Sequence, residues 1–182
     1  MTSYITQNGL LLNNLLEFYK KDNNLDKMLQ IINGESRISL RIVDWFATNY
    51  SKSNFTVYTL TNERRFKVYN DYKLKLRAYS KKRFDPFCRW ERINVPYKDG
   101  KSIQTTLGQL NFFKWAIENE VVKYIEENYT HIEADMNKRN SSSRRRNHGT
   151  ISQKTRKKRE ELSVSASKSI KKENVEIVIK FD

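Results

Sequence analysis

Cysteine, histidine, glycine and proline are all scarce in this 182-residue chain. It contains one cysteine (Cys88), two histidines, five glycines and two prolines. A single cysteine allows no internal disulfide, which fits a reducing compartment. The chain also has no glycine-rich phosphate-binding loop and no G-x-S-x-G motif. We therefore exclude the Rossmann, P-loop and serine-hydrolase classes of enzyme.

The residues that could bind a metal or act as a nucleophile are too isolated to form a site. His131 and His148 are far apart in sequence, whereas zinc ligands usually come in close pairs. We interpret both as solvent-exposed. Arg89 beside Cys88 makes a nucleophilic cysteine conceivable, but no histidine is near in sequence to serve as its base. We interpret Cys88 instead as a small buried residue in a turn. We expect no metal, no cofactor and no enzymatic activity.

Long hydrophobic runs are absent too. No apolar run approaches the roughly 18–20 residues that a membrane span needs, and Met1–Gly9 lacks the basic-then-apolar order of a secretory signal. We expect a protein that is neither secreted nor inserted into a membrane. Hydrophobic residues make up only 37%, but aromatic residues make up 12%, which disordered chains lack. The composition indicates one folded domain with a charged extension.

Positive charge is abundant and clustered. The chain has 35 Lys and Arg against 21 Asp and Glu, a formal net charge of +14. Arg64 to Arg92 contains 11 basic and 3 acidic residues, and Lys138 to Lys172 contains 13 basic and 2 acidic residues. Clustered positive charge attracts polyanions, and the arginine side chain fits phosphate with two hydrogen bonds. Nucleic acid is therefore the leading partner.

Apolar residues spaced three and four apart predict helices in the first third of the chain. The predicted helices are Tyr4–Lys21, Leu25–Ile32 and a third that opens at Ser36 or Ser39 and ends near residues 49–54. Asn33-Gly34 is typical of a helix C-terminus. A short strand is predicted at Phe55–Leu60.

The central part of the chain predicts a basic helix, a hairpin and a core helix. Phe66–Lys82 has an amphipathic pattern that Asp85-Pro86 must interrupt. Asp99-Gly100 favours a β-hairpin between 93–95 and 102–105. Thr106 and Gln109 form a capping box before an apolar helix at about Leu107–Glu127, which we expect to be the centre of the domain.

The C-terminal part changes in character. Residues 138–172 are predicted to form a basic flexible arm, and residues 173–182 a terminal β-strand in which Val175–Phe181 alternates apolar and polar residues. That strand could join the strand at Phe55–Leu60 and the hairpin, or pair with another chain. The predicted organisation is thus a mainly helical α+β domain at 1–137 with a small antiparallel sheet, then the arm, then the strand.

Two clusters of basic residues are candidate phosphate-binding sites. Bases stack on aromatic rings while Lys and Arg contact phosphates, so the basic-aromatic stretch Phe66–Trp90 is one candidate. The alternative is that Tyr69, Tyr72 and Tyr79 pack into the core and the lysines are only solvated. The candidate nucleic-acid-binding residues are Lys73, Arg77, Lys81, Lys82, Arg83 and Arg89 in this stretch, and Arg144, Arg145, Arg146, Lys154, Arg156, Lys157, Lys158 and Arg159 in the arm.

Three stretches carry a resemblance to known proteins: Ser39–Tyr50, Tyr79–Arg89 and Thr105–Asn119. With the Ser- and Arg-rich tail ending at Glu161–Ser167, they resemble a group of small basic proteins from large nucleocytoplasmic DNA viruses. The resemblance implies a viral setting and a virion component, and it transfers no catalytic residue. It places the protein in the virion or in the cytoplasm or nucleus of an infected cell, and it favours DNA over RNA as the partner.

Three functional hypotheses follow. The first is a non-enzymatic protein that binds the phosphate backbone without sequence preference, in genome packaging or a virion core. The alternative is a minor capsid or scaffold protein whose basic arm and terminal strand bind neighbouring viral subunits. Binding to a membrane surface ranks last, because the tail has almost no aromatic or leucine anchors.

Overall fold

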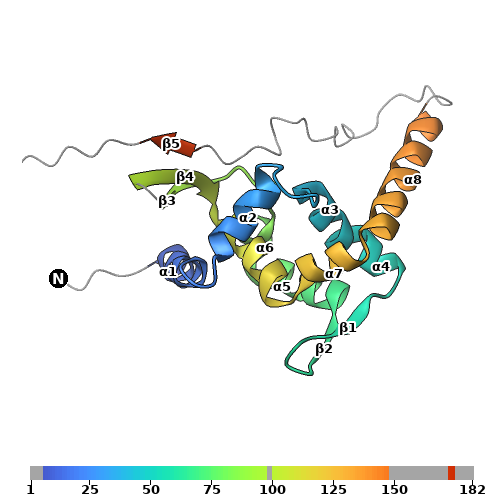
Figure 1. Ribbon diagram of the computed structural model, residues 1–182, viewed down its shortest axis with the longest axis horizontal. Helices are drawn as coiled ribbons and strands as arrows, with labels where there is room; N and C mark the ends of the chain where they lie inside the picture. Colours follow the sequence, from blue (N-terminus) through green and yellow to red (C-terminus); the bar gives the residue numbers. More distant parts are fainter. Residues whose placement is uncertain (1–5, 98–99, 148–171, 175–182) are drawn as a thin grey trace, which may run out of the picture.

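Helix α6 (Leu107–Glu118) is the central element of the protein. Four helices pack against it: α1 (Gln7–Tyr19), α2 (Asn24–Ile32), α5 (Val68–Phe84) and α7 (Val121–Glu127). Nine of its twelve residues are buried. The computed structural model describes residues 6–97, 100–147 and 172–174, which form a single mainly helical α+β domain with two small antiparallel sheets (Figure 1). The predicted fold class is confirmed, and the helix that begins at Leu107 lies at the centre of the domain as expected.

The helix starts that the sequence predicts are also present. The Thr106 hydroxyl accepts a hydrogen bond from the Gln109 backbone N–H at 3.2 Å, and the Ser39 hydroxyl accepts one from Ile42 N–H at 3.3 Å. Both hydroxyls satisfy backbone donors that the first turn of a helix leaves free. In the described residues the other helices are α1 (Gln7–Tyr19), α2 (Asn24–Ile32), α3 (Leu40–Trp45), the π-helix η1 (Phe46–Tyr50), α4 (Ser51–Ser53), α5 (Val68–Phe84), α7 (Val121–Glu127) and α8 (Tyr129–Asn147).

The strands form two separate sheets rather than one. Strands β1 (Val57–Thr59) and β2 (Arg65–Lys67) make an antiparallel hairpin that the sequence only half predicts, since β2 has a single apolar residue. The predicted hairpin at 93–105 is confirmed as β3 (Arg92–Pro96) and β4 (Lys101–Thr106). Strand β5 (Lys172–Asn174) pairs antiparallel with β4, whereas the predicted strand Val175–Phe181 lies outside the described residues.

The long helix predicted at about Leu107–Glu127 is in fact two helices, α6 and α7. The break lies at Asn119 and Glu120, and Glu120 has a left-handed backbone with φ of 54°. The β1–β2 hairpin holds this break in place: the Tyr58 hydroxyl donates to the Asn119 carbonyl at 2.7 Å, and Thr61 N–H donates to the Glu120 carboxylate at 2.8 Å. The hydrogen bonds from Thr61 lower the pKa of Glu120.

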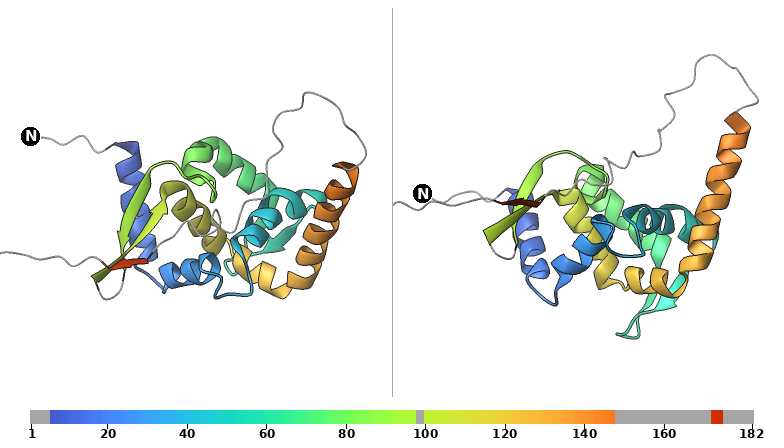
Figure 2. Two further views of the ribbon diagram at one scale, coloured as in Figure 1. Left: turned by 90° about the horizontal axis from the view of Figure 1, so that it is seen from above. Right: turned by 45° about the horizontal axis from the view of Figure 1, so that its top comes forward.

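Helix α8 extends to Asn147, whereas the sequence predicts a flexible arm from Lys138. Its first half is anchored by the buried residues Tyr129, Ile132 and Met136, and its last ten residues continue the helix from that anchored half. In Figure 1 and the right panel of Figure 2 this second half rises clear of the other helices. The division into domain, arm and terminal strand otherwise stays a prediction.

Gly108 is the position where α6 approaches the end of α5 most closely. A Cβ atom there would lie 2.8 Å from the Asp85 carbonyl oxygen and 3.1 Å from the Lys82 carbonyl oxygen. Both obstacles are backbone atoms, so G108A should destabilise the protein by about 1–3 kcal/mol in chemical denaturation. In an unobstructed helix the same change stabilises by roughly 1 kcal/mol, so a gain in stability would contradict the close approach.

Candidate nucleic-acid interface

Helix α5 presents one face to the core and the other to solvent, as its pattern predicts. Val68, Tyr72 and Phe84 are buried, and Leu76 and Tyr79 are partly buried against the core. The Tyr72 ring contacts Phe84, Phe112 and Trp115. Tyr72 is therefore a packing residue and not a surface for base stacking. The sequence alone leaves both roles open for this position.

The predicted basic residues of this region lie on the outer side of α5 and on the turn after it. We call these six residues the basic surface: Lys73, Arg77, Lys81, Lys82 and Arg89 are exposed, and Arg83 is half-buried. The ion pairs Lys114–Glu118, Glu120–Lys123 and Asp135–Arg139 lie elsewhere and involve no residue of the basic surface.

The acidic residues of the same stretch all accept hydrogen bonds from other residues of the protein, although Glu91 is itself exposed. The Asp71 carboxylate accepts a hydrogen bond from the Trp115 indole N–H at 2.7 Å, and Asp85 accepts one from Phe87 N–H at 2.9 Å. Glu91 accepts from the Asn8 amide at 3.3 Å. All three carboxylates have structural partners, so they offset the neighbouring positive charge less than free carboxylates would. A mixed-sign solvated surface would not show this segregation.

The last turn of α5 is displaced by a kink that the sequence does not reveal. Ser80 has φ of 61° and ψ of 168°, a backbone conformation that is essentially restricted to glycine. Such strain persists only where surrounding contacts impose it. Here the Asn111 amide donates to the Arg83 carbonyl at 2.8 Å, and Gly108 lies against the same turn. Helix α6 therefore fixes the position of the basic residues that follow Ser80.

The turn after α5 exposes an aromatic residue that is not among the predicted site residues. Asp85 and the buried Pro86 start the turn, with Cys88 N–H donating to the Asp85 carbonyl at 3.1 Å. Trp90 follows, with 45% of its surface exposed. The Lys82 ammonium lies 3.9 Å from the centre of the Trp90 ring. Its location in a basic-aromatic stretch is the sequence signal that could have identified it.

The arm residues cannot be placed beside the basic surface. Arg144, Arg145 and Arg146 belong to the helical backbone of α8. The other arm candidates, Lys154, Arg156, Lys157, Lys158 and Arg159, lie outside the described residues. The structure therefore brings together six of the predicted residues, and the role of the other eight stays a prediction.

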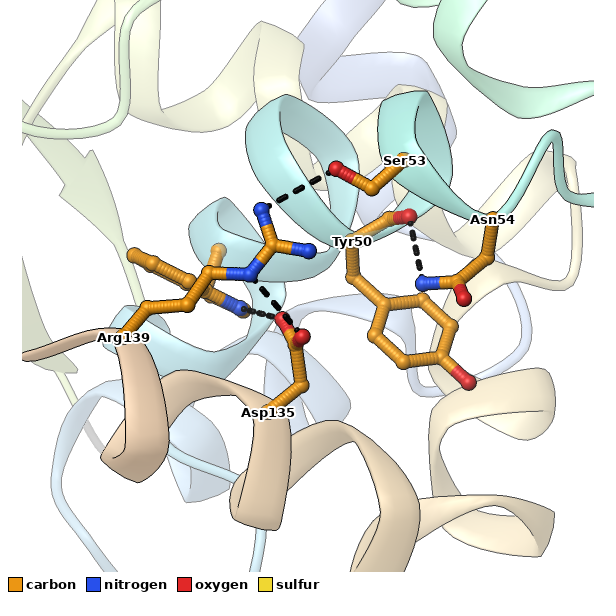
Figure 3. Close-up of polar contacts among 6 residues, drawn as sticks. Tyr50, Ser53, Asn54, Asp135 and Arg139 are labelled. Atoms are coloured by element: carbon orange, nitrogen blue, oxygen red, sulfur yellow. Dashed lines mark hydrogen bonds and ion pairs between the residues drawn. The ribbon is translucent and has the colours of Figure 1, made fainter. Parts of the chain in front are cut away.

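A second polar cluster joins α8 to the helices α3 and α4, and it is structural. The Asp135 carboxylate accepts hydrogen bonds from the Trp45 indole at 3.0 Å and from Arg139 Nε at 2.9 Å (Figure 3). Arg139 also donates to the Ser53 hydroxyl at 3.0 Å. Although Arg139 belongs to the basic stretch that begins at Lys138, its charge is used within the protein.

The π-helix η1 beside this cluster also has a structural explanation. Its wider register frees backbone carbonyls, and three side chains donate to carbonyls four residues earlier: Thr48 to Asp44, Ser51 to Ala47 and Asn54 to Tyr50. Within the described part of the chain, no group of three His, Cys, Asp or Glu residues could hold a metal ion. In the same part, no helix has the length and apolarity required to cross a membrane.

Comparison with known proteins identifies relatives without an assigned activity. Residues 4–171 match the family of unknown function DUF7197. The uncharacterized protein L507 of Acanthamoeba polyphaga mimivirus is 43% identical over 134 residues, which is 69% of this chain and 52% of that protein. The chain thus spans about half the length of this relative. No solved structure matches. The mimivirus relative confirms the resemblance to proteins of large nucleocytoplasmic DNA viruses.

Proposed function

This chain belongs to the family of unknown function DUF7197, and we propose that it is a non-enzymatic viral protein that binds the phosphate backbone of nucleic acid. Binding is independent of sequence and serves genome packaging or the virion core. The basic surface docks on the phosphates, and the arm residues from Arg144 to Arg159 add further contacts. DNA is favoured over RNA because the mimivirus relative comes from a DNA virus.

The observation that carries this proposal is the segregation of charge on one face of α5 and the turn after it. Between Lys73 and Arg89 the chain has five exposed and two half-buried cations, while each of the three acidic residues between Arg64 and Arg92 accepts a hydrogen bond from the protein. Polyanion binding of this kind comes from releasing the counterions of several phosphates, and it needs no pocket and no base contact. The kink at Ser80 and the contacts from α6 hold the cations on a rigid element.

The test compares two variants that lose the same charge from different places. K73A/R77A/K81A/K82A removes four cations of the basic surface, and K20A/K21A/K27A/K123A removes four exposed cations elsewhere. We expect the first variant to reduce the slope of log K against log salt by about 0.9 for each phosphate that it no longer neutralises. The second should reproduce the wild-type slope. If the slope falls equally in both variants, binding reflects only the net charge of the protein. The assignment of the basic surface as the docking site would then be wrong.

An assembly role is the second candidate, as a minor capsid or scaffold subunit. It is favoured by strand β5, which shows that the backbone at Lys172–Asn174 can add to the edge of a sheet. In that role the following strand, Val175–Phe181, pairs with a neighbouring viral subunit and the cations meet acidic protein surfaces. If this role is correct, the protein forms oligomers that are lost when Val175–Asp182 is deleted, and it shows no salt-dependent binding to DNA.

A further inference from the structure

Trp90 differs from the other two tryptophans, whose indole N–H groups donate to carboxylates within the described part of the chain. Trp45 donates to Asp135 and Trp115 donates to Asp71, so both are tied into the core. Among the described residues no acceptor for the Trp90 indole is found, and 45% of the side chain is exposed. Trp90 therefore offers a partner both an aromatic surface and an indole N–H donor.

Basic residues outnumber acidic ones around Trp90. Lys82 places its ammonium 3.9 Å from the ring centre, a cation–π contact, and Arg89 is the exposed residue immediately before Trp90. The exposed Glu91, immediately after Trp90, accepts a hydrogen bond from the Asn8 amide. A flat aromatic ring beside cations has the chemistry that single-stranded nucleic acid requires: a base stacks on the ring and its phosphates meet the cations. An acidic protein partner would need the cations but not the ring.

Contacts hold the chain on both sides of Trp90. The turn before it begins with Asp85, whose side chain accepts from Phe87 N–H and whose carbonyl lies against Gly108, and two residues after it Arg92 pairs with Thr106 in the β3–β4 hairpin. The preceding turn of helix is held through the Arg83 carbonyl by Asn111. A stacking residue held in this way loses little conformational entropy on binding, which is the condition for a useful contribution to affinity.

We infer that Trp90 is a stacking platform for an unpaired base, so that the nucleic acid held at the basic surface is single-stranded. This rests on the proposed function, since Lys82, Arg83 and Arg89 must contact phosphate. Within a duplex the bases are stacked on one another, and a side chain reaches their faces only after the strand is opened. The platform therefore gives single strands an advantage that phosphate contacts alone do not provide.

The experiment measures the affinity of the full-length protein for three probes: a homothymidine strand of about 20 nucleotides, an abasic strand of the same length, and a random duplex. The variants are W90A, W90F and, as a matched control, L74A, which removes another apolar side chain that is 62% exposed on α5. W90A should weaken binding of the homothymidine strand by about 5-fold to 150-fold. Its affinity for the abasic strand and for the duplex should equal that of the wild-type protein. W90F should retain part of the affinity, and L74A should retain all of it.

Each alternative outcome overturns a different statement. An equal loss on all three probes in W90A would make Trp90 a support for the cations and not a platform. No loss on any probe would exclude stacking while leaving the proposed function intact. If the wild-type protein binds none of the probes, the proposed function fails together with this inference. Circular dichroism of W90A before and after heating checks that the variant is folded.

Discussion

Binding of the full-length protein to random duplex DNA is expected to weaken by about 10³-fold to 10⁵-fold when salt rises from about 50 mM to about 200 mM. That range applies to a protein that neutralises six to ten phosphates, and the basic surface together with the arm offers fourteen candidate cations. Fluorescence anisotropy at several salt concentrations gives the slope directly. An affinity that hardly changes with salt would contradict backbone binding altogether.

The contribution of the arm is best measured by substitution, because strand β5 follows the arm in sequence and a truncation would remove both. Replacing Lys154, Arg156, Lys157, Lys158 and Arg159 with alanine keeps the chain length and the terminal segment. We expect the salt slope to fall by up to about 4.5, which is 0.9 for each phosphate that the five cations would neutralise. If the slope is unchanged, the basic surface alone carries the binding and the arm has another use.

F84A is expected to lower the free energy of unfolding by about 3–5 kcal/mol. Phe84 is completely buried at the end of α5, where its ring lies 5.8 Å from the rings of both Phe112 and Trp115. Truncation to alanine leaves a cavity among rigid aromatic rings that cannot collapse to fill it. Since domains are stable by only roughly 5–15 kcal/mol, this one change would remove a large part of the total.

The matched control for this prediction is F55A. Phe55 is 86% exposed, so the same change of side chain removes almost no buried surface. It should alter the free energy of unfolding by no more than about 0.5 kcal/mol in the same urea titration. Comparable destabilisation in F84A and F55A would mean that the core between α5 and α6 is not packed as described.

The sequence predicts the elements whose signals are local. Helix α6 is apolar nearly all round and begins with a Thr–Gln capping box, and both features are visible without a structure. The break after α6 is not predictable in this way, because the apolar spacing continues through Val121 and Ile125. It depends on hydrogen bonds from Tyr58 and Arg64, which lie 61 and 55 residues earlier. Contacts at such distances leave no periodic pattern.

Some features of the candidate site can also be predicted from the local sequence pattern, and others cannot. The exposure of Lys73 and Arg77 follows from the amphipathic pattern of α5, and the packing role of Tyr72 follows from it too. The kink at Ser80 has no local signal, since neither glycine nor proline marks it, and it depends on contacts with α6. The exposure of Trp90, which follows the turn at Asp85, has no local signal in the sequence either. Tertiary contacts, not residue type, decide these positions.

The length of α8 has an electrostatic consequence. Asn147 lies eleven residues beyond Met136, the last buried residue among those described in this helix. At a rise of about 1.5 Å per residue, the end of the helix backbone lies roughly 16 Å past Met136 and about 12 Å past Arg139, which donates to Ser53 on α4. Both distances exceed the screening length of roughly 8 Å at physiological ionic strength. A charge at that end of the helix would therefore interact only weakly with the charges of the domain.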